Sequence, residues 1–263
     1  MLAERRDDAS HMSIDVIVPN LNGGRYLAAT LRSIAENAGT RAIVVDGGST
    51  DGSRELAERS PGTVVVLDRT PGLSRAVNLG IEHSTAPLLM WLGADDRLIH
   101  GASTRVERAM LTRPDAMWGY GSVRFIDADD RTLGCRAARW HGFGALLLRN
   151  YIATPGVFFK RAALDAVGRF DEGLSLAMDY DMWVRLAREW PPVIVPELVG
   201  EYRVHSSTLS QRLSARQVGE TYVVARRNAT TFGQGLRVHA YHRLRAVRWR
   251  YLPAPRQGDW TPC

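Results

Sequence analysis

The sequence predicts an α/β fold built on a Rossmann-like, mostly parallel central sheet with helices on its faces. Short β-branched or apolar runs, each bounded by Gly, Pro, Asp or Asn, alternate with helical stretches through the first hundred residues. The first helical stretch carries Leu27, Leu31 and Ile34 at the spacing of one helix face. Strict alternation of strand and helix indicates a sheet joined by right-handed crossovers.

The individual elements are expected in the following order. Strands fall at 14–18, 42–45, 63–67 and 88–92, and the helices between them at 25–38, 51–59 and 74–83. After residue 94 the pattern predicts a hairpin of 123–126 and 132–135, a strand at 156–159, helices at 162–167 and 180–189, and a last strand at 199–204. From residue 215 onwards we expect helices, broken near Gly233 and Gly235.

Length and composition suit one large domain or one domain with an appendage, since 263 residues with 45% hydrophobic content can bury a full core. The longest apolar run, 86–92, is far shorter than the roughly 20 residues of a membrane span. Residues 1–12 lack the apolar stretch of a secretory signal and are interpreted as a disordered leader or tag remnant. Cys135 and Cys263 lie far apart, so neither a disulfide framework nor a zinc site is expected, and a reducing cytosol fits.

The net charge of +6 is concentrated in the C-terminal extension. Residues 212–263 contain ten arginines against Glu220 and Asp259, a balance of +8. Such a segment suits an anionic lipid surface or an acidic partner. A nucleic-acid partner is not expected, because the charge is confined to this extension and no recognised binding motif accompanies it.

Polar residues follow three of the predicted strands, at the sheet edge where α/β proteins bind ligands. Residues 19–24 follow the first strand, Asp46 ends the second, and Asp95 and Asp96 follow the fourth. Asp46 stands where a carboxylate can accept from a base N–H or a ribose hydroxyl. The residues after it, 49–52, suit a turn that caps the next helix.

Asp95 and Asp96 are adjacent carboxylates at the end of a buried strand. Two negative charges side by side raise each other's proton affinity unless a cation offsets them. A divalent cation that also binds the substrate phosphates, Mg²⁺ or Mn²⁺, is the simplest such partner. The alternative is a turn in which Asp96 caps a helix or pairs with Arg97.

Asp179 is predicted to cap the helix that follows it, and it also suits a place in the crevice. Asp181 lies about 200° further round that helix, so at most one of the two carboxylates can face the crevice. Met178, Met182 and Leu186 form a stripe assigned to the core. An ordinary surface role or a ligand contact remains open for His205, which ends the last strand.

Taken together, these segments resemble the family 2 glycosyltransferases of the GT-A fold. The matching stretches appear in the family's order: 17–23, 44–52, 75–80, 91–96, 170–172 with 178–183, and 202–205. The resemblance covers a GT-A domain at 13–210, with a nucleotide-binding half at 13–100 and an acceptor half at 101–210. A basic helical extension follows at 211–263.

The resemblance implies roles for individual residues. Asp179 matches the catalytic base, and Asp95 and Asp96 match the acidic DxD-type turn, although Gly93 stands where a first Asp often lies. His205 would complete the metal shell or contact a phosphate. The remaining expected site residues are Pro19, Asn20, Asn22, Asp46 and Arg75 at the nucleotide, and Gly156, Asp181 and Trp183 at the donor and acceptor pocket.

The function implied is inverting transfer of a sugar from a UDP-, dTDP- or GDP-sugar to a hydroxyl, aided by Mn²⁺ or Mg²⁺. The acceptor would be a saccharide or a lipid-linked molecule in polysaccharide, O-antigen or glycolipid synthesis, at a cytoplasmic or peripheral inner-membrane location. A sugar nucleotidyltransferase is the nearest rival, but residues 20–25 offer one cation rather than a basic phosphate loop. The second alternative is a non-catalytic module that binds a sugar nucleotide.

The extension carries an apolar stripe of its own. Residues spaced three and four apart recur through it: Leu236, Ala240, Leu244, Val247 and Tyr251. The favoured interpretation is a helix that packs this stripe on the catalytic domain or on a second copy of the chain. The alternative is an interfacial helix on an anionic membrane that holds a lipid-linked acceptor.

Overall fold

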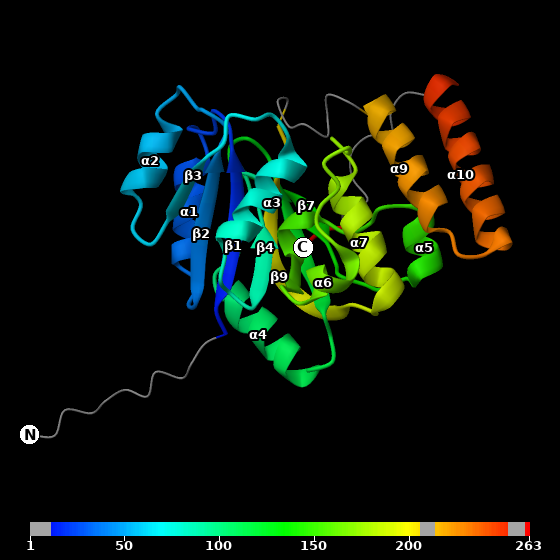
Figure 1. Ribbon diagram of the computed structural model, residues 1–263, viewed down its shortest axis with the longest axis horizontal. Coiled ribbons are helices and arrows are strands. Elements are labelled where there is room, and N and C mark those ends of the chain that lie inside the picture. The colour runs from blue at the N-terminus through cyan, green and yellow to red at the C-terminus, as the bar shows by residue number, and fades with distance from the viewer. Residues whose placement is uncertain (1–11, 206–213, 252–260) are drawn as a thin grey trace, which may run out of the picture.

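The computed structural model describes residues 12–205, 214–251 and 261–263, and its centre is one sheet with helices on both faces (Figure 1). Within these residues nine strands form the sheet in the order β3-β2-β1-β4-β8-β6-β9-β5, with β7 paired to β6. The predicted α/β class is confirmed. The leader predicted at 1–12 lies outside the described residues except for Met12, whose backbone N–H donates to Glu107.

The first half of the sheet is parallel, with the predicted helical crossovers. Its strands are β1 (Ile14–Asn20), β2 (Thr40–Asp46), β3 (Val64–Leu67) and β4 (Leu88–Trp91). The crossover helices are α1 (Leu27–Ala35), α2 (Ser53–Arg59) and α3 (Leu73–His83). Because β1 pairs in parallel with both β2 and β4, the residues that follow these three strands meet at one edge.

The second half mixes parallel and antiparallel pairing: β8 runs antiparallel to β4 and β6, whereas β9 runs parallel to β6. Its strands are β5 (Arg97–Leu98), β6 (Trp118–Ile126), β7 (Thr132–Arg136), β8 (Val157–Lys160) and β9 (Val193–Arg203). Its helices are α4 (Ala102–Thr112), α5 (Phe143–Leu148), the 3₁₀ turn η1 (Thr154–Gly156), α6 (Ala163–Val167) and α7 (Met178–Glu189).

Sequence periodicity missed several features of this half, among them α4, α5, the short β5 and the early part of β6. Helix α4 buries Ala102, Ser103, Val106 and Met110, a face too poor in large apolar residues to stand out. Strand β6 begins at Trp118 rather than at 123. The sequence pattern does not show this earlier start, because the first residues of β6 include two glycines, which are poor strand formers. The glycines are needed for close packing: a Cβ on either one would lie within 2.5 Å of β9 atoms.

Helices α9 (Ser214–Asn228) and α10 (Phe232–Tyr251) form the predicted C-terminal helical extension and lie beside α7 and α5 (Figure 1). The break predicted near Gly233 and Gly235 is present but lies slightly earlier, between Asn228 and Phe232, and both glycines lie inside α10. The chain breaks just before, where Thr231 Oγ1 accepts from the Gln234 N–H and the Gln234 side chain accepts from the Thr230 N–H. Such reciprocal bonds cap a helix start.

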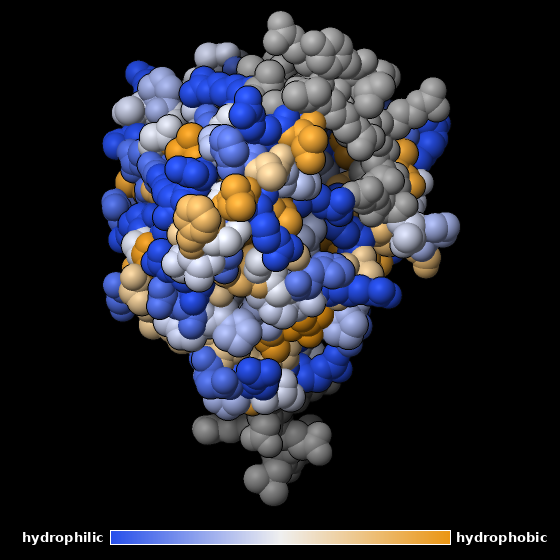
Figure 2. All heavy atoms as spheres, turned by 90° about the vertical axis from the view of Figure 1, so that its right-hand side faces the viewer, coloured by the Kyte–Doolittle hydropathy of each residue, from blue (hydrophilic) through white to orange (hydrophobic). Residues whose placement is uncertain are grey.

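The apolar stripe on α10 faces outward, which corrects the part of the favoured interpretation that packs it on the catalytic domain; packing on a second copy stays a prediction. Phe232, Leu236 and Leu244 are 90%, 60% and 72% exposed, whereas Val238 and His242 turn inward. Figure 2 views this side of the molecule, where apolar residues lie among hydrophilic ones. The side chains of Val247 and Tyr251, also expected in the stripe, lie outside the described residues.

The two cysteines are joined, contrary to the expectation from their distance in sequence. Cys135 on β7 and Cys263 form a disulfide with Cα atoms 5.1 Å apart. Backbone bonds of 2.8 and 3.0 Å between Cys135 and Thr261 bring the two segments together. The sequence argument for a reducing compartment therefore loses its basis. No helix in the described part of the chain is long and apolar enough to cross a membrane.

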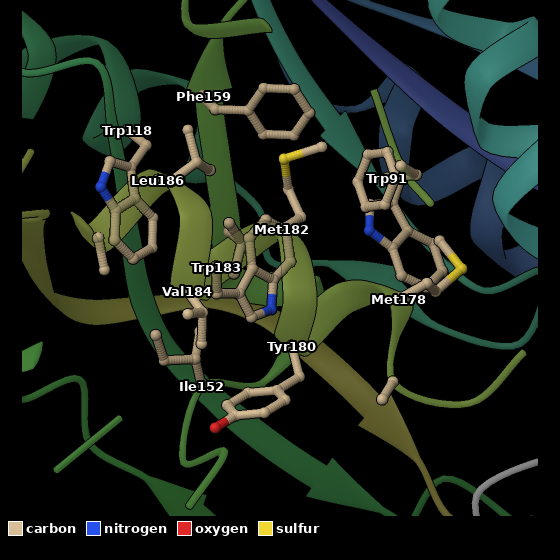
Figure 3. Packing of buried hydrophobic residues seen from close by; sticks show 14 of the residues in the cluster. Trp91, Trp118, Ile152, Phe159, Met178, Tyr180, Met182, Trp183, Val184 and Leu186 are labelled. Carbon is tan, nitrogen blue, oxygen red and sulfur yellow. The ribbon is translucent and has the colours of Figure 1, made fainter. Parts of the chain in front are cut away.

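The core has two parts, one on each face of the sheet. Helices α1, α2 and α4 cover one face, and α3, α5, α6 and α7 cover the other. Adjacent residues of β4 alternate between them, with Leu89 and Trp91 on the α7 face. Figure 3 shows the α7 face, where Met178, Met182 and Leu186 are buried as predicted.

Candidate active site

An open cleft lies between the end of β4 and the start of α7. Asp95 and Asp96 line it from the β4 side, and Thr154 and Asp179 from η1 and α7. Asp95 also lines a second hollow, over the residues that follow β1, together with Pro19, Asn22, Tyr26 and His205. The predicted acidic turn and the predicted base thus share one cleft, and Asp95 borders both hollows.

The acidic turn presents two carboxylate oxygens to one small space. Asp96 Oδ1 accepts from the Arg203 N–H at 2.9 Å, and Asp95 Oδ2 lies 2.8 Å from His205 Nε2. The other oxygens, Asp95 Oδ1 and Asp96 Oδ2, would lie 2.5 and 3.1 Å from a Cβ on Gly93. The absent side chain of Gly93 therefore leaves the space that these two oxygens face.

The surroundings of Asp96 favour a positive partner in that space. Burial, and then the neighbouring charge of Asp95, raise the pKa of Asp96 well above its ordinary value. Two hard oxygen ligands fit Mg²⁺ or Mn²⁺, which commonly bind one or two carboxylates and complete their shell with water and substrate phosphate. Among the described residues no group of three or more His, Cys, Asp or Glu gathers to hold a metal ion. His205 touches Asp95 rather than completing such a group.

Arg203 holds the acidic turn in place, a role that the sequence did not reveal. Its side chain is 2% exposed, and its Nε donates to the Asp95 carbonyl at 2.9 Å. Its Nη1 reaches the β6–β7 turn, at the Asp127 carbonyl and the Asp130 carboxylate. In the sequence, the only signal for Arg203 is its place in the stretch 202–205, two residues before His205.

Asp179 is partly buried in the first turn of α7, and Ala177 rather than Asp179 is the N-cap residue. Its Oδ1 accepts from the Tyr180 N–H at 2.6 Å, and its Oδ2 from Thr154 Oγ1 at 3.3 Å and Asn150 Nδ2 at 3.5 Å. Burial raises the pKa of Asp179, and these donors offset part of that shift. The result is a proton acceptor that takes up its proton more readily than an exposed carboxylate.

Asp46 shapes a turn and has no exposed surface, and its direct contact with a base stays a prediction. Its Oδ1 accepts from the N–H groups of Gly48 and Ser49, and its Oδ2 from Asn20 Nδ2 and Ser49 Oγ. These bonds lower its pKa despite its burial. Asn20 is likewise 3% exposed. Asp46 and Asn20 thus fix the loops after β2 and β1.

Asn22 and Pro19 lie where a nucleotide site was predicted. Asn22 adopts a left-handed backbone with φ of 54°, and its Oδ1 accepts from the Thr50 N–H at 2.9 Å. This bond ties the loop after β1 to the loop after β2. Arg75 lies at the start of α3 and pairs with Asp68 at 2.8 Å, and it is not among the described residues that line the two hollows.

Three predicted pocket residues are structural instead. Asp181 is fully buried and pairs with Arg185 and Arg227 on the side of α7 away from the cleft. Trp183 lies in the core, stacked on Trp118 with ring centroids 6.4 Å apart (Figure 3). Gly156 is buried in η1, where a Cβ would come within 2.6 Å of the β6 backbone. The helix period put Asp181 opposite Asp179, as expected, but only packing shows which carboxylate faces the cleft.

The curled, mostly parallel sheet with its flanking helices defines the fold class, which is the fold of solved GT-A glycosyltransferases. The chain belongs to glycosyl transferase family 2, because the model of that family matches residues 15–156, just over half of the chain. The resemblance seen in the sequence is thereby confirmed. Asp179 and His205 lie beyond the matched residues.

Three similar proteins have informative names. A PGL/p-HBAD biosynthesis glycosyltransferase of Mycobacterium bovis is 27% identical over 180 residues, covering 65% of this chain and 68% of its own. S. aureus TarS 1-349 in complex with UDP-GlcNAc superposes with a TM-score of 0.63 at 13% identity, over 91% and 73% of the chains. Mannosyltransferase PcManGT of Pyrobaculum calidifontis, in complex with GDP-Man and Mn²⁺, superposes with a TM-score of 0.64 at 20% identity. The match covers 92% of this chain and 76% of that one.

Proposed function

We propose that this protein transfers a sugar from a nucleoside-diphosphate sugar to an acceptor hydroxyl with inversion, and that Asp179 is the base. The observation that carries the proposal is the shared cleft, in which Asp179 stands across from the acidic turn of Asp95 and Asp96. A single base that deprotonates the acceptor, followed by direct displacement at the anomeric carbon, gives inversion. The two solved neighbours that hold nucleotide sugars support this class of donor.

Asp179 is suited to receive the proton of the acceptor hydroxyl. Thr154 and Asn150 hold its Oδ2 from the η1 side, so the carboxylate keeps one orientation toward the cleft. The neighbouring Tyr180 N–H stabilises its charged form. As the acceptor oxygen attacks, its proton passes to Asp179, and the nucleoside diphosphate leaves from the opposite side of the anomeric carbon.

Asp95 and Asp96 would hold the divalent cation through Asp95 Oδ1 and Asp96 Oδ2, in the space over Gly93. When bound, Mn²⁺ or Mg²⁺ neutralises the charge that gathers on the departing diphosphate. Asp95 is the more accessible of the two, with its side chain 28% exposed, and Asp96 is anchored by Arg203. Pro19, Asn22 and His205 line the hollow next to Asp95, which we assign to the nucleotide.

The test is a thermal-shift series with UDP-, GDP-, dTDP- and CDP-sugars, with and without Mn²⁺, followed by nucleotide release with saccharide acceptors. We expect one nucleotide to raise the melting temperature only when Mn²⁺ is present, because a ligand that binds the native state stabilises it. Asp179→Asn should keep this shift and lose turnover by about 10²–10⁴-fold. A wild type that binds the donor without any turnover would instead indicate a non-catalytic binding module.

A finer proposal concerns the lipid-linked acceptor. We propose that α10 rests on an anionic membrane surface through its outward stripe. Phe232, Leu236 and Leu244 are exposed at steps of four and eight residues along one side of the helix, with exposed Arg237 and Arg243 beside them. Apolar side chains enter the interface, while each arginine adds about 1 kcal/mol near anionic lipid.

Vesicle co-sedimentation tests this surface. Wild type should bind vesicles that contain anionic lipid at low salt and release them at high salt, and Leu236→Ser with Leu244→Ser should abolish binding. Leu111→Ser is the matched control, since Leu111 is 63% exposed on α4, away from the extension. Wild type that ignores anionic vesicles, but self-associates through Leu236 and Leu244, would show that the stripe meets a second copy instead.

A further inference from the structure

Helix α9 lies against the loop that leads into α7. One carboxylate oxygen of Glu220 accepts from three consecutive backbone N–H groups, those of Ser175, Leu176 and Ala177, at 3.1, 2.7 and 3.1 Å. The side chain of Glu220 is 13% exposed. Backbone N–H groups that precede or begin a helix have no partner within it, and an anionic acceptor stabilises them well.

The neighbours of Glu220 hold the same loop from the side. Gln217 donates to the Leu176 carbonyl at 3.3 Å and also lines the cleft. Arg216 donates to Ser175 Oγ at 3.0 Å and to the second oxygen of Glu220 at 3.2 Å. The first two turns of α9 thus bind the loop through three N–H groups, the Leu176 carbonyl and the Ser175 hydroxyl.

This loop forms part of the cleft wall and determines where α7 begins. Ser175 and Leu176 line the cleft, and Asp179 follows Ala177 by only two residues. A displacement of the loop therefore displaces the carboxylate of Asp179. Movement of a catalytic group by about 1 Å can lower a rate roughly a hundredfold.

We infer that Glu220 is a positioning residue: by holding the N–H groups of residues 175–177 it fixes Asp179 for the transfer reaction. The extension is then part of the active site rather than an appendage. This inference rests on the proposed function in one respect, the assignment of Asp179 as the base. Glu220 lies outside the residues that the family model matches.

The first test measures the geometry without any substrate. Hydrogen exchange of the backbone amides is compared in wild type, Glu220→Ala and Glu220→Gln. We expect exchange at Ser175, Leu176 and Ala177 to accelerate at least about tenfold in Glu220→Ala, because their common acceptor is lost. Glu220→Gln keeps an acceptor oxygen and should recover much of the protection. Unchanged exchange in Glu220→Ala would overturn the inference.

The second test separates positioning from stability. Glu220→Ala should lower kcat about tenfold to a hundredfold while the Kd of the donor stays within about twofold of wild type, and Glu220→Gln should restore most of kcat. Arg227→Gln is the matched control, since Arg227 anchors the other end of α9 on Asp171 and Asp181. We expect it to lower the melting temperature and leave kcat of the folded enzyme unchanged.

The outcomes are distinct. Equal kcat losses in Glu220→Ala and Arg227→Gln would mean that α9 acts only as a support, and wild-type kcat in Glu220→Ala would mean that the loop does not place the base. A wild type that turns over no nucleotide sugar would contradict the proposed function. The exchange experiment would then still decide whether Glu220 holds the loop.

Discussion

At the scale of the residue, Asp179 and Asp181 lie two positions apart in one helix and meet opposite surroundings. Asp181 is neutralised by Arg185 and Arg227, whereas Asp179 has only uncharged donors and faces the cleft. Helix geometry indicates that at most one of these two carboxylates can face the cleft, and the family resemblance selects Asp179 as that one. Arg185 lies one helix turn after Asp181 on α7, but Arg227 comes from α9, so no local pattern could show that second arginine.

The raised pKa of Asp179 predicts the acid limb of the pH–rate profile. The base works only when ionised, so activity is lost as pH falls through this pKa, at a higher pH than for an ordinary carboxyl. Thr154→Val removes a donor that stabilises the charged form, so the pKa should rise further and the limb should move to higher pH. Profiles of kcat for both proteins measure this; a limb that moves to lower pH would contradict the role of Thr154.

Gly93→Ala tests the space between the two acidic side chains. Its Cβ would crowd Asp95 Oδ1 and Asp96 Oδ2, so we expect the Mn²⁺ concentration for half-maximal activity to rise about tenfold or more. Gly144→Ala on α5 is the control, since its Cβ would meet nothing within 4 Å. Titration of activity with Mn²⁺ gives both values. Equal Mn²⁺ requirements in the two variants would place the metal elsewhere.

At the scale of the element, the contact between α7 and α9 depends on buried charge. Asp181 is 0% exposed, and it links Arg185 of its own helix to Arg227 of α9. Removal of one partner from a buried pair leaves uncompensated charge, which commonly costs about 3–5 kcal/mol. Helices α7 and α9 were both predicted from the sequence, but the ion pairs that join them were not.

Asp181→Asn should therefore lower the free energy of unfolding by about 3 kcal/mol and leave kcat of the folded protein near that of wild type. Urea denaturation followed by circular dichroism measures the first quantity. Glu58→Gln is the comparison, because it breaks the exposed Arg54–Glu58 pair, where we expect a change of less than about 1 kcal/mol. Similar losses of unfolding free energy in both variants would show that the burial of Asp181 adds nothing to the stability of the protein.

At the scale of the whole molecule, the C-terminus returns to the sheet. The disulfide joins positions 128 residues apart and closes a loop that includes α5, α7, β9 and the extension. A crosslink of this kind acts mainly by restricting the unfolded chain, and typical native disulfides contribute about 2–4 kcal/mol.

Cys263→Ser should lower the free energy of unfolding by about 2–4 kcal/mol, and Cys135→Ser should have the same effect because either change removes the same crosslink. Reduction of wild type with dithiothreitol is expected to reproduce the loss and to change neither serine variant. Chemical denaturation under oxidising and reducing conditions measures all three. Wild type that is insensitive to reductant would mean that the bond contributes nothing to stability.

Local periodicity determined the first four strands, their crossover helices, the core stripe of α7 and the position of the acidic turn, because each depends on residues close together in the chain. Tertiary structure alone decided that Asp46 serves a turn, that Arg203 anchors the acidic turn and that the α10 stripe faces outward. It also decided that Glu220 holds the loop before Asp179 and that Cys135 meets Cys263. The contacts of Arg203 with Asp95, of Glu220 with residues 175–177 and of Cys135 with Cys263 join groups distant in sequence, so only the packing of the folded chain brings them within bonding distance.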